Sequence, residues 1–424
     1  MNIMVIGGGG REHAIVHKLS QSPKADKIYA LPGNGGIASI AECVPIGATD
    51  IDKIVEFTKS NSIDFAVVAP DDPLVLGAVD ALNAIGVKCF GPEAKAAIIE
   101  GSKVFSKNLM KKYNIPTAGY EVFSNPADAV EYIKNGSFPV VIKADGLALG
   151  KGVIIAESFD EAKDAVHMIM EDKVFGKSGN NIVVEEFLTG PEVSVLCFTD
   201  GKTIAPMVSS MDHKRIGDND TGLNTGGMGT IAPNPCYTEE IAEECMKTIF
   251  VPTVEAMNAE NRTFKGCLYF GLMLTPKGPK VIEYNCRFGD PETQVVLPLL
   301  ESDLLDIMIA TADGTLADCE VKFSDGAAAC VVVASEGYPK SYDKGIEITE
   351  KPLPEDSFVY HAGTALKDGK LVTSGGRVAG VTARADNLAD ALAKAYEATK
   401  SFEFSNKYMR NDIGQKALKI MQNS

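Results

Sequence analysis

Residues 280–292 place an acid, an amide, a cation and two further acids close together in the chain. The apolar alternation of 280–286 predicts a β-strand, whose two-residue period puts Glu283 and Asn285 on one face. Two oxygen ligands on one face suit a hard divalent cation, and Arg287 follows on the same side. Such a cation beside a guanidinium is what a transferring phosphoryl group or an acyl phosphate requires, because both spread negative charge over several oxygens. The alternative is a solvated strand face followed by a Gly-Asp-Pro turn.

A second candidate site is the glycine run 7–10, between a predicted strand and a predicted helix. Backbone N–H groups in such a turn, with the N-terminus of the helix, can receive an anion. A dinucleotide fold has a similar turn, but the second predicted strand ends at Leu31 with no acid after it to hold a ribose hydroxyl. We therefore favour a monophosphate over NAD. A tight turn that binds nothing is the structural alternative.

A third candidate begins with Lys143, which ends a predicted strand and precedes a glycine-spaced turn carrying a second lysine. The lysines can meet nucleotide phosphates, and the glycines let the backbone close over them. The spacing is not that of a Walker A loop, which needs Ser or Thr where Gly152 stands. A β-hairpin turn with two solvated lysines is the alternative.

Acids and cations also follow two later elements. The apolar strand predicted at 182–187 could bind adenine at its acidic end, and Glu192 could take ribose hydroxyls. An exposed acidic strand end is an equal alternative.

The polar, Gly-rich segment 212–230 is predicted to be a functional loop. Lys214 is a better phosphate candidate in it than the lone His213.

Composition limits the classes of function. The chain of 424 residues is too long for one core and predicts about three domains. The net charge of −16 and pI near 4.9 argue against nucleic acid or an anionic membrane as a partner. The cysteines lack close metal-binding spacing, no stretch has the length of a membrane span, and the N-terminus enters a strand without a signal-like segment. We expect reduced thiols and a cytoplasmic protein.

The order of predicted elements divides the chain into units. Alternating strands and helices at the start predict a parallel, doubly wound sheet. Later elements include a connecting helix with its lysines on the polar side, a long helix at 239–261 and a strand at 358–366. The expected units are 1–101 (N-terminal α/β domain), 102–119 (connecting helix), 120–190 (small α+β lid), 191–325 (central domain) and 326–424 (C-terminal domain).

Together these segments resemble the glycinamide ribonucleotide synthetase family of ATP-grasp carboxylate–amine ligases, essentially from end to end. The motifs that carry the resemblance are Gly8-Gly9-Gly10-Arg11-Glu12-His13, Pro32-Gly33-Asn34, the run from Ile142 to Gly152, Asp212-His213-Lys214-Arg215, Asn224-Thr225-Gly226-Gly227-Met228-Gly229, and the run from Arg287 to Gln294.

The resemblance implies an α/β, multidomain ATP-grasp fold with an N-terminal parallel sheet, a lid, a central ATP-grasp domain and a C-terminal α+β domain. It implies a ligase of purine biosynthesis that joins glycine to 5-phosphoribosylamine through glycyl phosphate, using ATP with Mg²⁺ or Mn²⁺. We expect a monomer, with no nucleic-acid or membrane partner.

The resemblance also assigns residues. For the nucleotide they are Lys103, Lys143, Gly146, Gly150, Lys151, Gly152, Glu185, Glu186, Phe187, Leu188 and Glu192. For the acceptor and substrates they are Gly8, Gly9, Gly10, Arg11, Asn34, Asp71, Asp212, His213, Lys214, Gly227, Met228, Arg287 and Asp290. Arg287, Asp212 and Lys214 would be catalytic, and Glu283 and Asn285 would hold the metal.

Departures from the family pattern bear on the site. Where Gly-Pro-Glu is expected after the third strand, the chain has Ala69-Pro70-Asp71, so the carboxylate is one methylene shorter. Cys286 replaces the usual Ala on the opposite strand face, where we expect it to be neutral. The strand at 269–273 offers no acid, so the metal would rely on two protein ligands with phosphates and water, which suits Mg²⁺.

Other functions remain as alternatives. A different ATP-grasp ligase or carboxylase would share the lysines and the lid but use another acceptor. A nucleotide sensor would bind ATP without turnover. A Rossmann oxidoreductase is disfavoured because no acid follows Leu31.

Overall fold

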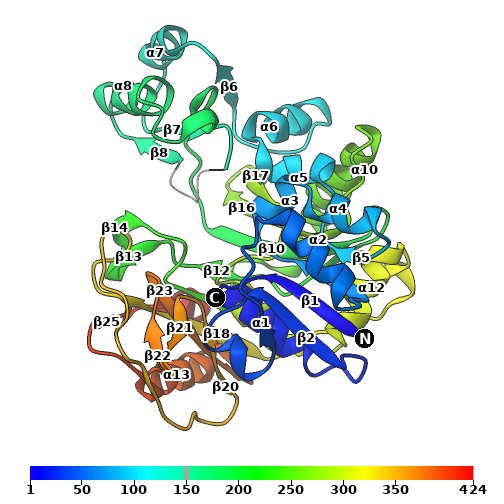
Figure 1. Cartoon of the computed structure of the whole chain (residues 1–424). Helices are drawn as coiled ribbons and strands as arrows, with labels where there is room; N and C mark the ends of the chain where they lie inside the picture. The colour runs from blue at the N-terminus through cyan, green and yellow to red at the C-terminus, as the bar shows by residue number, and fades with distance from the viewer. Residues whose placement is uncertain (148–151, 424) are drawn as a thin grey trace.

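The computed structural model describes residues 1–147 and 152–423 (Figure 1). The N-terminal domain is a parallel sheet, as the sequence predicts, and its strands lie in the order β3-β2-β1-β4-β5. Met4 and Ile6 of β1 pack into one apolar cluster and Ile3 and Val5 into another, so both faces of the sheet are covered. Its elements are β1 (Asn2–Gly7), α1 (Gly10–Leu19), β2 (Lys27–Pro32), β3 (Glu42–Cys43), α2 (Ile51–Ser60), β4 (Phe65–Val68), α3 (Asp71–Val75), α4 (Ala78–Ala84), β5 (Lys88–Phe90) and α5 (Ala94–Gly101).

The lid is an antiparallel sheet in the order β6-β9-β7-β8, and it stands away from the rest of the molecule in Figure 1. It has an apolar cluster of its own. β6 and α7 were not predicted; β6 is short, and it shows no regular alternation because its side chains are half-buried except for the exposed Glu121. The lid elements are β6 (Tyr120–Phe123), α7 (Pro126–Lys134), β7 (Val140–Ala144), β8 (Val153–Ala156), α8 (Phe159–Val166) and β9 (Ile182–Glu186).

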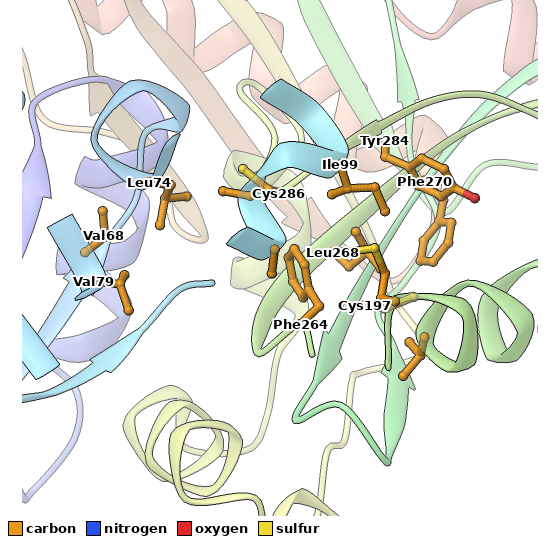
Figure 2. Close-up of a cluster of buried hydrophobic side chains, with 14 of the residues drawn as sticks. Val68, Leu74, Val79, Ile99, Cys197, Phe264, Leu268, Phe270, Tyr284 and Cys286 are labelled. Atoms are coloured by element: carbon orange, nitrogen blue, oxygen red, sulfur yellow. The ribbon is translucent and has the colours of Figure 1, made fainter. Parts of the chain in front are cut away.

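The central sheet is antiparallel, in the order β11-β10-β16-β17. Figure 2 shows its apolar core, where Ile99 of α5 lies near Phe270 of β16 and Tyr284 of β17. This shared core holds the end of α5 close to the end of β17. The elements here are β10 (Glu192–Thr199), β11 (Ile204–Pro206), β16 (Gly266–Thr275), β17 (Gly278–Asn285), α11 (Thr293–Leu299) and α12 (Leu304–Asp313).

The C-terminal sheet runs β12-β15-β18-β23-β20, with β25 beside β18. β12 and β15 come from the segment 212–230 that was expected in the central unit, yet β15 pairs along β18. The sheet elements are β12 (Met211–Asp212), β15 (Gly229–Ala232), β18 (Ala327–Ser335), β20 (Ser357–His361), β23 (Arg377–Ala385) and β25 (Lys407–Tyr408). The remaining elements are β19 (Thr349–Glu350), β21 (Thr364–Lys367), β22 (Lys370–Thr373), α13 (Leu388–Ala398), β24 (Phe402–Glu403) and α14 (Gln415–Asn423).

Two helix predictions were too long. The helix expected over 102–119 is α6 (Lys103–Lys112), which ends before Asn114, a residue at φ +55°, and before Pro116. The helix expected over 239–261 consists of α9 (Glu239–Cys245), a π-helical turn (Met246–Phe250) and α10 (Val251–Ala259). Pro252, which has no backbone N–H to donate to the preceding turn, lies just after the π-helical turn.

Two further predictions were wrong about local structure. The segment 212–230 is not a loop throughout, because β13 (Arg215–Gly217) and β14 (Thr221–Asn224) form a hairpin within it. The strand expected at 358–366 is divided between β20 and β21, which belong to different sheets. Among the described residues, none of the helices combines the length and apolar character needed to cross a membrane.

Candidate active site

The end of β17 carries the predicted metal pair. A bulge at Ile282 shifts the register so that Glu283 lies opposite Gly271 of β16. Tyr284 is buried in the core, so Glu283 and Asn285 lie on the other face of the strand. A Cβ atom at position 271 would be 3.1 Å from Cγ of Glu283, and glycine there therefore leaves room for the carboxylate.

Cations from separate parts of the fold face Glu283. Burial raises the pKa of this carboxyl, but the cations overcome that effect and hold its pKa below the usual value. They are Lys214 after β12, Lys143 on β7, Lys103 at the start of α6 and Arg287 after β17. These cations converge on one strand end, which is the arrangement that a polyanionic ligand requires.

The two predicted metal ligands, Glu283 and Asn285, would need further ligands from a bound substrate to complete a metal site. Within residues 1–147 and 152–423, no group of three or more His, Cys, Asp or Glu side chains is placed to hold a metal ion. Glu283 and Asn285 offer two hard oxygen ligands beside cations that can bind phosphate. That donor set fits a divalent cation whose other ligands are phosphate oxygens and water.

Glu185, expected beside adenine, lies between two buried lysines. Its Oε2 is 2.8 Å from Nζ of Lys107 and its Oε1 is 3.0 Å from Nζ of Lys143. Lys143 also donates to the carbonyl of Ile282 at 3.0 Å. Lys107 was expected on the polar side of its helix, but only 2% of it is exposed. The sequence feature that could have indicated the burial of Lys107 is Met110, a buried apolar residue three positions later on the same helix face.

The segment that follows Glu185 connects the lid with the central sheet. Glu186 accepts a hydrogen bond from the N–H of Gly119 at 3.0 Å and pairs with Lys280 at 2.9 Å. Phe187 is exposed and Leu188 is half-buried, which leaves this stretch accessible at the strand end. Glu192 at the start of β10 pairs with Lys214 at 2.9 Å, so the residue expected at the ribose lies beside one expected at the acceptor.

The glycine-spaced turn after β7 is described only in part. A Cβ atom on Gly146 would lie 2.3 Å from Oγ of Ser178, so packing alone requires glycine there. The carbonyl of Gly146 accepts from Nζ of Lys103 at 3.1 Å, and that of Gly152 accepts from the N–H of Ala144 at 2.8 Å. Gly150 and Lys151, both expected at the phosphates, lie outside the described residues.

Arg287 is held by an acid that sequence reasoning missed. Glu100, the seventh residue of α5, pairs through Oε1 with Arg287 at 2.9 Å and accepts through Oε2 from the N–H of Cys286 at 2.7 Å. Burial lowers the pKa of Arg287, but Glu100 and Asp71 outweigh it and raise the pKa further above neutrality. Nε of Arg287 is buried and has no hydrogen-bond partner among the described residues. The sequence feature that could have indicated this role is the acid Glu100, which follows the apolar residues Ile98 and Ile99 in the same helical turn.

The N-terminal glycine loop is tightly packed. A Cβ atom on Gly8 would be 2.3 Å from the carbonyl oxygen of Gly33, one on Gly9 2.7 Å from Oε2 of Glu12, and one on Gly10 2.6 Å from Nε2 of Gln294. The N–H of Gly9 already donates to Glu12 at 2.6 Å. These contacts give the glycines a structural reason that is independent of any phosphate.

Two polar residues predicted beside this loop have structural partners. Nδ2 of Asn34 donates to the carbonyls of Gly8 and His361, while its Oδ1 accepts from two backbone N–H groups. Arg11 pairs with Glu12 at 2.7 Å and donates to the carbonyl of Phe288 at 3.1 Å. Both side chains therefore shape the loop.

Asp290 connects the loop with two other units. Its Oδ2 accepts from the N–H of Arg11 at 3.4 Å, and its Oδ1 accepts from Gln294 at 2.8 Å. Arg377 of β23 donates to the carbonyls of Asp290 at 2.9 Å and of Gly226 at 2.6 Å. Sequence reasoning missed Arg377, because nothing near it in the chain shows that β23 reaches this site.

The residues around Asp212 differ in their surroundings. Gly227 has φ +113°, and a Cβ atom there would lie 2.6 Å from Oδ1 of Asp212. Burial and Glu292 raise the pKa of Asp212 well above its usual value, although Lys214 opposes them. Met228 is fully buried.

His213, predicted to bind substrate, has both ring nitrogens engaged. Nδ1 lies 3.1 Å from the carbonyl of Gly229, and Nε2 accepts from the N–H of Gly414 at 3.1 Å. Only 5% of the residue is exposed. Its role in the structure is to join β15 to the C-terminal segment.

Comparison with known proteins identifies the family to which the chain belongs. Models described as the N, ATP-grasp (A) and C domains of phosphoribosylglycinamide synthetase match residues 1–100, 101–293 and 328–416. A phosphoribosylamine–glycine ligase from Caldanaerobacter subterraneus is 50% identical over 97% of this chain and 99% of its own length.

Solved structures agree on the fold. The crystal structure of phosphoribosylamine–glycine ligase from Thermotoga maritima has a TM-score of 0.85 and 35% identity, and covers 97% of this chain and 100% of that chain. The biotin carboxylase domain of 2-oxoglutarate carboxylase from Hydrogenobacter thermophilus, at 17% identity and a TM-score of 0.74, shares the fold over 96% of this chain and 91% of its own. The chain therefore belongs to the phosphoribosylglycinamide synthetase family and has its ATP-grasp domain.

Proposed function

We propose that the chain joins the carboxylate of glycine to the amine of 5-phosphoribosylamine, consuming ATP and releasing ADP and phosphate, as a step of purine biosynthesis. The observation that carries the proposal is the set of cations from separate elements that face Glu283. Family membership over nearly the whole chain supports the choice of substrates.

The chemistry follows from the leaving group. A free carboxylate is a poor acyl donor because it would have to expel an oxide. Transfer of the γ-phosphoryl group of ATP to a glycine carboxylate oxygen gives glycyl phosphate and ADP. The acceptor amine then attacks the carbonyl carbon, phosphate leaves and the amine loses a proton. Lys103, Lys143 and Arg287 would stabilise the charge on the transferring group and on the tetrahedral intermediate.

We propose that ATP binds with a divalent cation, Mg²⁺ or Mn²⁺, held by Glu283 and Asn285. When bound, such an ion neutralises phosphate charge and orients the oxygens for in-line transfer. Arg287, held by Glu100 and facing Asp71, would contact the transferring group from the side of the N-terminal domain.

For the acceptor we propose the surface between the glycine loop 8–10, Asp290, Asp212 and Lys214. Gly227 supports the proposal because it keeps the backbone close to Asp212. Four further residues would contribute by fixing the backbone of this surface rather than by direct contact, namely Asn34, Arg11, His213 and Met228. We further propose that the lid, 120–190, closes over the nucleotide and excludes water from glycyl phosphate.

The division into N-terminal, lid, central and C-terminal domains, with β12 and β15 in the C-terminal sheet rather than in the central unit, the monomeric state and a cytoplasmic location are parts of the same proposal. The cysteines, all within the described residues and none of them paired, support a reducing compartment. Gel filtration at micromolar concentration would test the monomer directly.

The decisive experiment is ADP release by the purified protein with Mg²⁺-ATP, glycine and freshly made phosphoribosylamine, omitting each component in turn. We expect release only when both glycine and phosphoribosylamine are present. ADP release that does not depend on phosphoribosylamine, or that depends on bicarbonate or another amino acid, would contradict the assigned substrates and identify a different ATP-grasp ligase or carboxylase.

A further inference from the structure

Lys107 is a buried cation at the junction between the lid and the rest of the molecule. It projects from α6, while Glu185 lies on β9 of the lid. Nζ of Lys107 donates to Oγ1 of Thr117 at 2.7 Å, and that hydroxyl donates to the carbonyl of Val281 at 2.7 Å. Thr117 belongs to the connection 113–119, which we call the hinge segment. Lys107 thus contacts the hinge segment and the lid at once.

The contact with Glu185 reaches the nucleotide site. The carboxylate of Glu185 lies between two ammonium groups, with Lys107 at Oε2 and Lys143 at Oε1. All three side chains are at most 5% exposed, so little water competes for these contacts. Among the described residues, the ammonium of Lys143 has one hydrogen-bond partner, the carbonyl of Ile282 next to Glu283, and its contact with Oε1 of Glu185 is an ion pair without hydrogen-bond geometry. The position of its ammonium group therefore depends on where Glu185 is held.

We propose that Lys107 is a positioning residue for the nucleotide: it fixes Glu185 at the base of the lid and, through Glu185, aims the ammonium of Lys143 at the phosphates. The inference rests on the proposed function, because it takes Lys143 to be a phosphate ligand. Lys107 itself does not touch the nucleotide. Its loss leaves Lys143 present but free to turn toward an uncompensated Glu185.

The arrangement also depends on pH. Burial lowers the pKa of Lys107 to about 8, although Glu185 opposes the effect. The other groups that face it are Lys143 on β7, Glu186 on β9 and the ring of Tyr120 on β6. Lys107 is charged below about pH 8 and loses its proton above it, so Glu185 is held less firmly in alkaline solution. Nucleotide affinity should fall as the pH rises through this range.

The test is the affinity of the full chain for a non-hydrolysable ATP analogue with Mg²⁺, measured by calorimetry between pH 7 and 9. Lys107→Met removes the charge at similar length. We expect it to weaken binding about tenfold at pH 7, as the loss of a charge-assisted hydrogen bond would. Its affinity should no longer vary through pH 8, and KM for glycine should stay unchanged.

The matched control is Lys111→Met, one turn further along α6, where the lysine is exposed and lies the same 5.7 Å from the ring of Tyr120. It should keep both the affinity and the pH dependence of the unmodified protein. A folded Lys107→Met variant with unmodified affinity would overturn the inference. If Lys107→Met does not fold, Thr117→Val provides the test, because it removes the hydrogen bonds of the Thr117 hydroxyl to Lys107 and to the carbonyl of Val281 while Lys107 keeps its ion pair with Glu185. We expect weaker binding, and unchanged affinity would refute the role of Lys107.

The proposed function is tested separately. If the unmodified protein binds the analogue but releases no ADP with glycine and phosphoribosylamine, the substrate assignment fails. The effect of Lys107 on nucleotide affinity would still be measured in the same titrations.

Discussion

At the scale of single residues, the site is built from side chains that point to one place from different parts of the chain. Glu283 and Asn285 share a strand face through local alternation, but the cations around them do not come from neighbouring positions. Lys103 begins α6, Lys143 lies within β7 and Lys214 follows β12. The electrostatic character of the site therefore comes from charged side chains of separate elements that meet at one strand end.

The metal pair gives the first prediction. Glu283→Gln and Asn285→Ala should each raise the Mg²⁺ concentration needed for half-maximal ADP release by about tenfold or more, because each removes a hard oxygen ligand or its charge. Glu240→Gln, an exposed acid on α9, is the control and should have no effect. Normal activity of both variants across a Mg²⁺ titration would show that the pair does not hold the metal.

Glu100 gives the second prediction. Its two oxygens serve the guanidinium of Arg287 and the N–H of Cys286, and an amide cannot accept from both. Glu100→Gln should therefore lower kcat roughly tenfold while KM for ATP changes less than about twofold. Glu93→Gln, at the other end of α5, should leave both constants unchanged. A rise in KM for ATP without a fall in kcat would remove Glu100 from the support of Arg287.

At the scale of elements, a buried arginine is one of several residues of the C-terminal segment that attach the hairpin β13–β14. Arg410 is 1% exposed, pairs with Asp220 at 2.9 Å and with Asp412 at 2.7 Å, and donates to the carbonyl of Arg215 at 3.1 Å. Both acids keep some contact with water, which limits the penalty for their charge. The hairpin precedes the turn at Gly226 and Gly227 that faces the acceptor surface.

Arg410→Met should lower the free energy of unfolding by about 3 kcal/mol, the lower end of the range for breaking a buried ion pair. Lys416→Met is the matched control, because Lys416 also pairs with Asp220 but is 64% exposed. It should cost less than about 0.5 kcal/mol. Urea denaturation of the two variants measures the difference, and equal losses would mean that burial of Arg410 adds nothing.

At the scale of the whole molecule, neutral histidines join the C-terminal sheet to its neighbours. Nδ1 of His13 on α1 accepts from the N–H of His361 on β20 at 2.8 Å, and burial, with His361 and His17, lowers the pKa of His13 well below its usual value. Burial, with Arg410, lowers the pKa of His213 to about 4. Both imidazoles must accept hydrogen bonds, so both need to be unprotonated in the folded state.

The consequence is loss of stability in weak acid. The folded pKa of His213 lies below the unfolded value near 6.5, so its contribution is complete above pH 6.5 and is lost as the pH falls from there to about 4. Over that window the free energy of unfolding should fall by up to about 1.4 kcal/mol per pH unit for each such histidine. His213→Gln should flatten the profile, while His167→Gln, at an exposed position, should not. Equal slopes in both variants would contradict the assignment.

The sequence alone predicted much of this protein, because local patterns encode it. The alternation of short apolar strands with helices over about the first 100 residues predicted the parallel sheet, and the strand pattern of 280–286 predicted the shared face of Glu283 and Asn285. The family motifs run the length of the chain, and membership of the family was confirmed by comparison. These features depend on a residue and its near neighbours.

Only the tertiary structure decided which distant side chains meet. Lys107 reads as a polar-face lysine until β9 brings Glu185 beside it, and Glu100 and Arg377 become part of the site through contacts across 187 and 87 positions respectively. The same holds for β15, whose place in the C-terminal sheet depends on β18. Burial and charge pairing are properties of the assembled fold. A pattern of near neighbours can predict a strand face, but not the partner that the chain brings to it from another domain.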